Sequence, residues 1–446
     1  MEKETILNIG FDDTDSPKGM CTTFLAYKIV DLLKKQKTEF LDFPRLIRFN
    51  PNIPWKTRGN GAVSMKIKTK NPSSVKSQVK NLVSKYSDVK NGANPGLVFF
   101  ESETIPSDFI DFSNLALWRL INRNNAKKFA KKNHLEFFYK GNGQGLVGAI
   151  GAIGYDFHDH TLELLSYRKR SKFGKERKIS PDSVKIMQEK TLPNTFNSFD
   201  TKKGRVLITP HGPDPVFYGV RGENVDSLLY ATKILKSEEK LDGYMIFKSN
   251  QGTGDHLKNE LTFENMSPYA SGKITGMVSN TPKTVKGGHV FFKINSNDHE
   301  LWCAVYKPTG ITTIASNLIK GDKVCVGGGV RKASKNFPRI INLEFIDVIH
   351  LEKKLVTSNP LCKKCNKKMK SKGKNQGFQC IRCGKKALSK TSNEVSRKIQ
   401  KKLYIPKMSA HRHLTRPSQR VGLINKSTKF DESQSWFCVY RNYSGE

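Results

Sequence analysis

Two cysteine pairs near the C-terminal end constrain the fold of this chain more than any other feature. Cys362 and Cys365 are separated by two residues, as are Cys380 and Cys383, and fourteen residues lie between the pairs. Each Cys-x-x-Cys turn offers two thiolates to one ion, and four thiolates complete a tetrahedral zinc shell with no position open for catalysis. The spacing therefore predicts a zinc ribbon with a structural Zn²⁺. The alternative, a pair of disulfides, is not expected in an intracellular chain.

The charge of the chain is its second strong feature. Lys and Arg number 77 against 40 Asp and Glu, a formal net charge of +37, which indicates a polyanionic partner such as nucleic acid or an anionic membrane surface. Residues 361–420 contain 19 of these cations and a single acid, Glu394. No apolar run approaches the ~18 residues of a membrane span, and the first residues do not resemble a secretory signal. We therefore expect a cytoplasmic protein with no membrane partner.

Near the N-terminus, a strand-like run at 6–11 leads through an acidic loop to a helix-like pattern at 24–33. Three carboxylates crowd this loop: Asp12, Asp13 and Asp15. Close carboxylates repel one another, and a bound cation would relieve that repulsion. The following helix start would favour an anion, so the segment predicts Mg²⁺ carrying nucleotide phosphates, with Thr22 or Thr23 near a phosphate oxygen. The alternative is an Asx-turn with a helix cap, which needs one acid rather than three.

Residues 1–130 alternate strand-like and helix-like runs, including a strand at 45–49 and an amphipathic helix at 114–132, and this predicts an α/β domain. Residues 131–265 predict a compact α+β domain. Its expected strands are 136–139, 161–167, 205–209 and 243–248, with a helix at 225–235. A basic patch at 168–178 interrupts this second domain. We interpret the patch as a solvated loop, with contact to nucleic acid as the alternative.

Residues 266–350 show five short strand patterns with a helix-like piece at 313–319 between the third and fourth, which is the order of an OB-fold. Its candidate base-stacking aromatics are Phe291, Phe292, Trp302 and Tyr306, although alternation on a strand sends some of them into the core. The zinc ribbon and a basic tail then occupy 351–446. The fold class is thus multidomain, combining α/β and α+β domains, an OB-fold β-barrel and a C-terminal zinc ribbon.

Residues 143–148 match Gly-x-Gly-x-x-Gly, and Glu163 follows at the distance of a dinucleotide-binding fingerprint. A Rossmann oxidoreductase is one hypothesis, but further glycines at 151 and 154 leave little room for the helix that the fingerprint requires. We favour close backbone packing or a polar ligand there. No Gly-x-x-x-x-Gly-Lys-[Ser/Thr] motif occurs in the sequence, so any use of ATP must come from the aspartate loop.

Two further loops carry polar groups. The Pro- and Gly-rich loop at 209–222 holds His211, Asp214 and Arg221; the histidine could donate to a phosphate or move a proton, and the arginine could grip phosphate oxygens. A structural role for His211 is equally open. Asn250 and Gln251 follow a strand and could read a base edge or simply form a turn. The loop at 51–61 could wrap phosphates but is a weak signal alone.

Several of these strings together resemble the archaeal tRNA(Ile) 2-agmatinylcytidine synthetase (TiaS) family. The segments that carry the resemblance are 10–16, 19–23, 43–48, 56–62, 145–149, 209–215, 250–253 and 410–414. The resemblance implies an ATP-dependent ligase that joins agmatine to carbon 2 of the wobble cytidine of the CAU-anticodon isoleucine tRNA. The base oxygen would be activated by phosphoryl transfer and then displaced by the agmatine amine, and decoding would change from AUG to AUA.

The same resemblance implies domains and residue roles. The domains are a kinase-like 1–130, a ferredoxin-like, agmatine-binding 131–265, an OB-fold at 266–350, and the ribbon with its tail at 351–446. The implied catalytic residues are Asp12, Asp13, Asp15, Thr22 and His211, with Asp12 and Asp13 on Mg²⁺. The implied ATP-binding residues are Gly19, Thr23, Arg58 and Arg221, and those for substrate are Asp214, Asn250 and Gln251. From charge alone, Asp156, Asp159, Glu163 and Asp214 are candidates for binding the agmatine dication.

Two other classes of function stay open at this point. One is a non-catalytic RNA-binding adaptor in which the OB-fold and ribbon do all the binding and the aspartate loop is structural. The other is the oxidoreductase, which predicts affinity for NAD(H). The resemblance indicates ATP, Mg²⁺ and structural Zn²⁺ as cofactors and tRNA and agmatine as partners, with no obligate protein partner.

Overall fold

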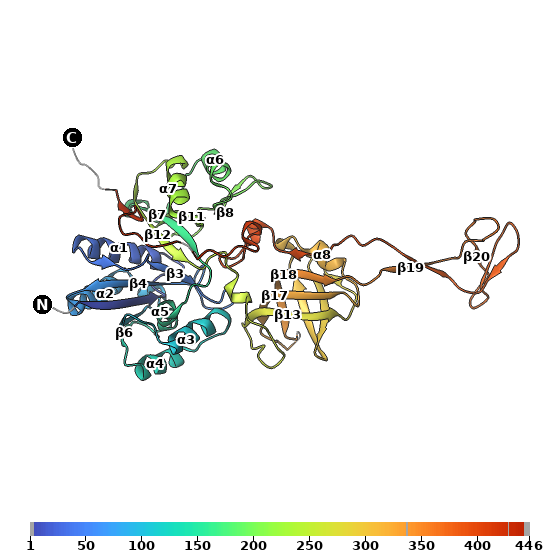
Figure 1. Cartoon of the computed structure of the whole chain (residues 1–446), viewed down its shortest axis with the longest axis horizontal. Coiled ribbons are helices and arrows are strands. Elements are labelled where there is room, and N and C mark those ends of the chain that lie inside the picture. Colours follow the sequence, from blue (N-terminus) through green and yellow to red (C-terminus); the bar gives the residue numbers. More distant parts are fainter. Residues whose placement is uncertain (1–3, 336–337, 427, 441–446) are drawn as a thin grey trace. The chain divides into compact units, whose positions relative to one another are not determined.

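The computed structural model describes residues 4–335, 338–426 and 428–440, and the chain forms two compact units (Figure 1). The first unit contains the described residues up to Lys273, those of 327–339, and those from Ile405 onward; the second contains 274–326 and 340–404. The C-terminal segment that the sequence groups with the zinc ribbon therefore packs within the first unit. In the described part of the chain, no helix is both long and apolar enough to cross a membrane.

One continuous sheet forms the centre of the first unit. Its strands, in spatial order, are β6 (Glu136–Tyr139), β5 (Gly96–Glu101), β1 (Thr5–Asp12), β4 (Gly61–Thr69), β3 (Arg45–Arg48), β12 (Leu241–Ser249), β7 (Thr161–Arg168), β11 (Val216–Gly222) and β8 (Thr195–Phe196). Strand β2 (Glu39–Phe40) pairs with β4, and β25 (Phe437–Val439) pairs with β12. The parallel pairing of β3 with β12 joins the two regions that the sequence separates as α/β and α+β.

Helices cover both faces of the N-terminal half of this sheet. Helices α1 (Thr22–Lys35) and α2 (Pro72–Tyr86) share a hydrophobic core with the alternate β1 residues Leu7, Ile9 and Phe11. On the opposite face, α3 (Ser107–Trp118), α4 (Arg123–Lys132) and α5 (Gly145–Gly154) form a second core. Because side chains alternate along a strand, β1 is buried on both faces and its carboxyl end is held firmly in place.

Three details of the expected elements are wrong. The helix expected at 114–132 is two helices, because the chain turns extended at Arg119 and the side chain of Asn122 caps the start of α4 by accepting from Asn124 N at 2.9 Å. The strand expected at 205–209 is limited to β10 (Arg205–Val206), paired with β9 (Phe199–Asp200). Residues 216–222, expected as loop, form β11, so Arg221 projects from a strand.

Two helices accompany the other half of the sheet. Helix α7 (Val225–Ile234) confirms the pattern at 225–235, and Asn224 caps it by accepting from Ser227 N at 2.9 Å. Helix α6 (Pro181–Thr191) follows the basic patch and was not expected. It begins at a proline after Ser180, whose hydroxyl accepts from Ser183 N, a common way to start a helix.

The OB-fold prediction is confirmed by a closed barrel. Its strands are β13 (Ser271–Val278), β17 (Lys323–Arg331), β18 (Ile340–His350), β16 (His299–Val305) and β15 (Val290–Ser296), and β13 also pairs with β15. Helix α8 (Thr312–Ser316) lies between the third and fourth strands in sequence, as expected. Of the candidate aromatics, Phe292 is buried in the core, whereas Phe291, Trp302 and Tyr306 are partly exposed. Short strands β14 (Lys283–Thr284) and β24 (Leu403–Tyr404) extend the barrel sheet.

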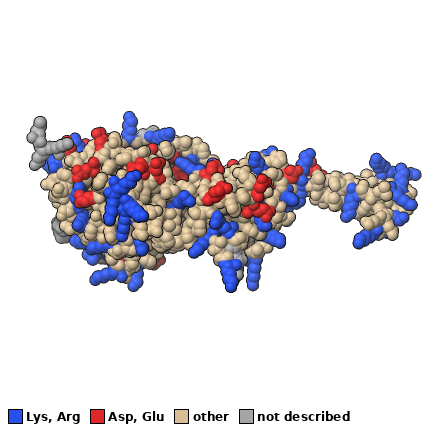
Figure 2. All heavy atoms as spheres, turned by 90° about the horizontal axis from the view of Figure 1, so that it is seen from below, with Lys and Arg blue, Asp and Glu red and all other residues tan. Residues whose placement is uncertain are grey.

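The zinc ribbon is a small three-stranded sheet of β20 (Lys370–Ser371), β21 (Phe378–Gln379) and β22 (Lys386–Ala387). Strands β19 (Leu355–Ser358) and β23 (Thr391–Glu394) pair where the chain enters and leaves it. Its small core contains Met369, Phe378 and the cysteines. Blue Lys and Arg side chains crowd its visible surface at the right of Figure 2, which is the placement a phosphate-binding surface needs.

Candidate active site

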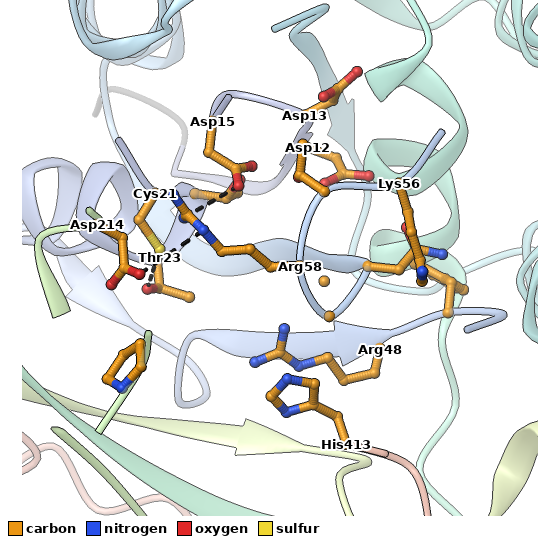
Figure 3. A pocket seen from close by; sticks show the side chains of 18 of the residues that line it. Asp12, Asp13, Asp15, Cys21, Thr23, Arg48, Lys56, Arg58, Asp214 and His413 are labelled. Atoms are coloured by element: carbon orange, nitrogen blue, oxygen red, sulfur yellow. Dashed lines mark hydrogen bonds and ion pairs between the residues drawn. The ribbon is translucent and has the colours of Figure 1, made fainter. Parts of the chain in front are cut away.

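A cavity of about 440 Å³ in the first unit gathers most of the predicted site residues (Figure 3). Its walls come from the acidic loop, the start of α1, the loop between β3 and β4, strands β7 and β11, and the loop before β11. The predicted residues that line it are Asp12, Asp13, Asp15, Thr22, Thr23, Arg58, His211, Asp214 and Arg221. Of the remaining predictions, Gly19 borders open space, and Asn250 and Gln251 are buried.

The acidic loop is the most strongly perturbed part of the cavity. Burial and the charge of Asp13 raise the pKa of Asp12 well above its ordinary value. Burial and the charge of Asp15 raise the pKa of Asp13 to about 7, and burial also raises the pKa of Asp15. Asp15 has a countercharge in Arg58, whereas the desolvated carboxylates of Asp12 and Asp13 offer hard oxygen ligands in a low-dielectric site. They fit Mg²⁺, which prefers oxygen ligands and lowers carboxyl pKa values by its own charge.

Helix α5 packs against the start of this loop, at Asp12. A Cβ atom at Gly148 would overlap the carboxylate of Asp12, and one at Gly145 would overlap the Asp12 backbone. The glycines of the 143–148 motif therefore allow close backbone packing, as the sequence favours. The expectation that glycines leave little room for a helix is wrong, because α5 runs through Gly145, Gly148, Gly151 and Gly154.

Arg58 links the two acidic parts of the cavity. Its Nη1 lies 3.1 Å from Asp15 Oδ2 and donates to the Met20 carbonyl at 2.8 Å, while its Nε lies 3.8 Å from Asp214 Oδ2. Figure 3 shows its guanidinium between these two carboxylates. The loop at 51–61 was only a weak indication of phosphate binding in the sequence. In the structure it places the Arg58 guanidinium between Asp15 and Asp214.

Arg177 supports the loop that carries Asp214. This guanidinium donates to the carbonyls of Val216, Pro210, Gly212 and Asp214 at 2.7 to 2.9 Å and lies 3.4 Å from Asp214 Oδ1. Burial raises the pKa of Asp214, against the lowering effect of Arg58 and Arg177.

The interpretation of 168–178 as a solvated loop is therefore wrong for two of its cations. Arg177 supports the Asp214 loop, and Arg168 is fully buried and pairs with Glu239 at 2.6 Å. A buried guanidinium needs a carboxylate or several carbonyls, and both arginines have them. The exposed cations of this segment are Arg170, Lys172, Lys175 and Lys178.

The hydroxyl-bearing residues at the start of α1 behave differently from His211. Thr22 is buried and its hydroxyl accepts from Thr14 at 3.0 Å, and the Thr23 hydroxyl lies 3.1 Å from Cys21 Sγ. His211 is exposed at the rim, with its Nε2 2.6 Å from Arg205 Nη2. Both threonines are thus fixed by local contacts, whereas His211 is an exposed residue of the cavity lining.

A buried network forms the wall opposite the acidic loop. Glu163 lies 3.2 Å from Arg221 Nε and 3.6 Å from Arg48 Nη2, and it accepts a hydrogen bond from Gln251. His413, from the C-terminal segment, completes this wall and lines the cavity. Neither Arg48 nor His413 was expected in the site from the sequence, although both belong to strings that carry the family resemblance.

The structure gives other predicted substrate residues internal partners. Asn250 pairs with the backbone of Arg48, accepting from its N at 2.8 Å and donating to its O at 3.0 Å. Among the carboxylates suggested for agmatine, Glu163 and Asp214 line the cavity, while Asp159 pairs with Arg416 and Arg420 at 2.8 Å and Asp156 is exposed.

The four predicted zinc ligands come together in the ribbon. One Sγ atom from each of Cys362, Cys365, Cys380 and Cys383 lies within 4.8 Å of the others. Hydrogen bonds from the backbone N–H groups of Cys383 and Arg382 lower the pKa of Cys380, whereas the neighbouring thiols Cys383 and Cys380 raise the pKa of Cys365, as expected of thiols crowded at one site. The donor set fits tetrahedral Zn²⁺.

These features define a class of protein. It combines a pocket lined by carboxylates and arginines, suited to a metal ion and phosphates, with an OB-fold and a zinc ribbon. Family models match three parts of the chain: TiaS TCKD domain at 8–75, TiaS FLD domain at 143–256, and TiaS C-terminal zinc ribbon domain at 359–399. The protein belongs to the tRNA(Ile) 2-agmatinylcytidine synthetase TiaS family, which confirms the resemblance seen in the sequence.

Relatives with that name cover nearly the whole chain. The protein of Cenarchaeum symbiosum (strain A) is 47% identical over 98% of this chain and 97% of its own, and that of Thermococcus sibiricus (strain DSM 12597 / MM 739) is 38% identical over 92% and 95%. A crystal structure of TiaS in complex with its isoleucine tRNA and ATP matches with a TM-score of 0.85 at 34% identity, covering 95% of this chain and 99% of that one. A complex of TiaS with the same tRNA, AMPCPP and agmatine matches with a TM-score of 0.82 at 32% identity and the same coverage.

Proposed function

We propose that this protein is an ATP-dependent enzyme that attaches agmatine to carbon 2 of the wobble cytidine of the CAU-anticodon isoleucine tRNA. The product is 2-agmatinylcytidine, and the tRNA then reads AUA instead of AUG. The observation that carries this proposal is full-length similarity to synthetases of this name, together with solved TiaS complexes that contain tRNA, ATP or its analogue, and agmatine. The protein would work in the cytoplasm, where its tRNA partner is used.

The acidic loop is the proposed ATP site. Asp12 and Asp13 would hold Mg²⁺, since their raised pKa values mark them as buried carboxylates in need of a countercharge. When bound, Mg²⁺ would neutralise charge on the ATP phosphates. Asp15 would orient Arg58, whose guanidinium could then face phosphate oxygens. The remaining proposed ATP contacts are Gly19, Thr22, Thr23, His211 and Arg221.

The proposed chemistry has two steps. An oxygen on a pyrimidine ring is a poor leaving group until it is phosphorylated, and phosphoryl transfer needs mainly positioning and positive charge. Arg48, Arg58 and Lys56 supply such charge around the cavity. The agmatine amine would then displace the phosphorylated oxygen. The wobble base would leave its stack to reach this pocket, as bases do in other base-modifying enzymes.

Asp214 is the proposed contact for the cationic substrate, because it is a cavity carboxylate with one oxygen, Oδ2, that accepts no hydrogen bond within the described structure. Asn250 and Gln251 would act indirectly by fixing Arg48 and Glu163. The four-domain division is proposed as in the sequence analysis: kinase-like 1–130, agmatine-binding 131–265, and tRNA gripping by the OB-fold at 266–350 and the ribbon region at 351–446.

Mass spectrometry of tRNA nucleosides tests this function. An unmodified CAU-anticodon isoleucine tRNA is incubated with protein, Mg²⁺, ATP and agmatine, and cytidine is examined for a mass gain of one agmatine less one water, since the base oxygen is lost. The wild type should form this product, and Asp13→Asn should not. Asp31→Asn serves as the matched control, because Asp31 pairs with Lys35 on the surface of α1. Binding of tRNA by the wild type without any product would favour the RNA-binding adaptor instead.

A further inference from the structure

The wall of the cavity opposite the acidic loop contains a chain of three hydrogen-bonded side chains that end at His413. His413 Nδ1 lies 2.9 Å from Gln251 Oε1, and Gln251 Nε2 donates to Glu163 Oε2. Arg221 Nη2 also lies near the ring, 3.1 Å from Nδ1. Figure 3 shows His413 beside Arg48 and across the cavity from Asp12 and Asp13.

The partners of Gln251 determine which ring nitrogen of His413 carries the proton. An ionised carboxylate only accepts hydrogen bonds, so the Gln251 NH₂ group must face Glu163 and its carbonyl oxygen must face His413. The carbonyl oxygen in turn accepts, and because it lies closer to Nδ1 (2.9 Å) than the donor Arg221 Nη2 does (3.1 Å), we assign the proton to Nδ1. The neutral ring then has its lone pair on Nε2, and His413 offers the cavity a hydrogen-bond acceptor.

Charged neighbours keep the ring neutral. Arg48 approaches from β3 and Arg221 from β11, and the carboxylate of Glu163 on β7 is already shared by both guanidiniums. A second proton on the imidazole would add a third cation to this buried group. Consistently, burial and the charges of Arg48 and Arg221 hold the pKa of His413 well below its ordinary value. Nε2 therefore remains an acceptor across neutral pH.

The two arginines also restrict what Nε2 can accept from. A cationic donor, such as either end of agmatine, would be repelled by Arg48 and Arg221 at this wall. The 4-amino group of cytosine is an uncharged donor, whereas uracil has a carbonyl oxygen at that position. Gly59, which also lines the cavity, packs against the Cδ2–Nε2 edge of the His413 ring, and a side chain at this position would cover Nε2.

We propose that His413 is a specificity-determining residue whose Nε2 accepts a hydrogen bond from the 4-amino group of the target cytosine and rejects uracil. Gln251 is its positioning residue, because it fixes the tautomer. This inference rests on the proposed function. It also gives Gln251, which the sequence suggests as a reader of a base edge, an indirect part in that reading.

Loss of Gln251 gives a specific prediction. In Gln251→Met the side chain keeps its length but loses the oxygen that holds the Nδ1 proton. Nδ1 can then accept from Arg221 Nη2, which is already 3.1 Å away, and the ring proton moves to Nε2. His413 would become a donor toward the cavity, a partner for the 4-oxygen of uracil.

The experiment uses two tRNAs that differ only in having C or U at the wobble position, with agmatine incorporation measured by nucleoside mass spectrometry. We expect the wild type to favour C over U by at least about 100-fold, as sites built on one hydrogen bond do. Gln251→Met should reduce this ratio by about tenfold or more through a faster reaction with U. His413→Ala should reduce it through a slower reaction with C.

His411→Ala is the matched control. His411 is two residues away in the same motif, and its Nε2 donates to the Pro406 carbonyl at 2.8 Å, so its loss should leave the C-to-U ratio unchanged. A third tRNA needs no variant protein: a wobble 2-pyrimidinone nucleoside, which lacks the 4-amino group, should react at least about 100-fold more slowly than C with the wild type.

The inference is overturned if the wild type accepts 2-pyrimidinone as well as cytosine. It is also overturned if folded Gln251→Met and His413→Ala keep the wild-type ratio, or if His413→Ala changes only the KM for ATP, since Nε2 would then serve the adenine amino group. Absence of product from the wild type with C would instead contradict the proposed function.

Discussion

Burial sets the charge of the side chains on which the proposed site depends. The three carboxylates of the acidic loop have raised pKa values because they are desolvated next to one another, and the cations Arg48 and Arg58 face them across the cavity. Burying any of these charges alone costs free energy. Bound phosphates would offset the charge of the arginines, and a bound metal ion would offset that of the carboxylates. The first two predictions concern single residues of this kind.

Ligand-linked stability tests Asp13. If Mg²⁺ and ATP bind the folded protein in the proposed site, they should raise the free energy of unfolding of the wild type by about 2.7 kcal/mol at 100 times the dissociation constant. Asp13→Asn should lose most of this gain, because the site then lacks one of its ligands. Differential scanning calorimetry with and without Mg²⁺–ATP measures it. An equal gain in the free energy of unfolding of the variant would show that Asp13 is not a ligand of the metal ion.

His160 should make the protein less stable in mild acid. Burial and the charge of Lys248 lower the pKa of His160 to about 4, so the folded protein keeps this ring neutral where an unfolded chain protonates it. The unfolded state then binds more protons, and stability falls as pH drops from about 6.5 to about 4. Urea unfolding across this range should show a smaller fall for His160→Gln. An identical pH profile would contradict the assignment.

Among the secondary-structure elements, helix α5 shows how packing overrides helix propensity. Each glycine costs about 1 kcal/mol in a helix interior, and α5 contains four, which is why no helix was expected there from the sequence. The helix forms because those glycines let its backbone approach β1 and α3. The strand and helix around the acidic loop were easier to predict, since their apolar periodicity is strong.

Two substitutions in α5 separate packing from function. Gly148→Ala should displace the Asp12 carboxylate, whereas Gly154→Ala should collide with the backbone of Phe109. Both should lower the melting temperature, because both overpack the same helix by a methyl group, a cost of about 1–3 kcal/mol. Only Gly148→Ala should also reduce the rate of the folded enzyme, by roughly 10-fold or more. If the two folded variants react at equal rates, the position of the Asp12 carboxylate does not matter for catalysis.

The ribbon should be separable from the chemistry. Cys380→Ser removes one of four thiolates and should unfold this small element, whose stability comes largely from zinc. Every residue that lines the cavity lies in the first unit, so binding of ATP should persist. Binding of tRNA should weaken and become less dependent on salt, because the ribbon carries a large share of the cations. Filter binding at two salt concentrations and ATP titration measure the two effects.

At the scale of the whole molecule, the cavity depends on contacts between residues far apart in the sequence. Asp12, Asp13 and Asp15 could be predicted because three acids crowd one loop, and the zinc ligands because their spacing is specific. Glu163 and Gln251 were candidates from the sequence, but Arg48, His413 and the wall that the four form together could not be predicted, because these residues meet only when β3, β7 and the C-terminal segment come together. The sequence signal for His413 was its place in the His-Arg-His string, which indicates no chemical role.

The sheet shows the same limit. The sequence separates an α/β region from an α+β region, and both textures are present, but one parallel pairing of β3 with β12 joins them into a continuous sheet. Lys248 opposite Arg45 and Ser249 opposite Leu46 carry no recognisable signal for that pairing. The same pairing places Asn250 against the backbone of Arg48 and so shapes the cavity wall.

Transfer of the base oxygen tests the central claim, that the cavity activates cytidine by phosphoryl transfer. A CAU-anticodon isoleucine tRNA with oxygen-18 at carbon 2 of the wobble cytidine is converted with ATP and agmatine, and the released phosphate is analysed by mass spectrometry. The account predicts phosphate that carries the oxygen-18 label, formed by the wild type and lost with Asp13→Asn. Agmatinylated tRNA accompanied by unlabelled phosphate, with the label in water, would contradict it.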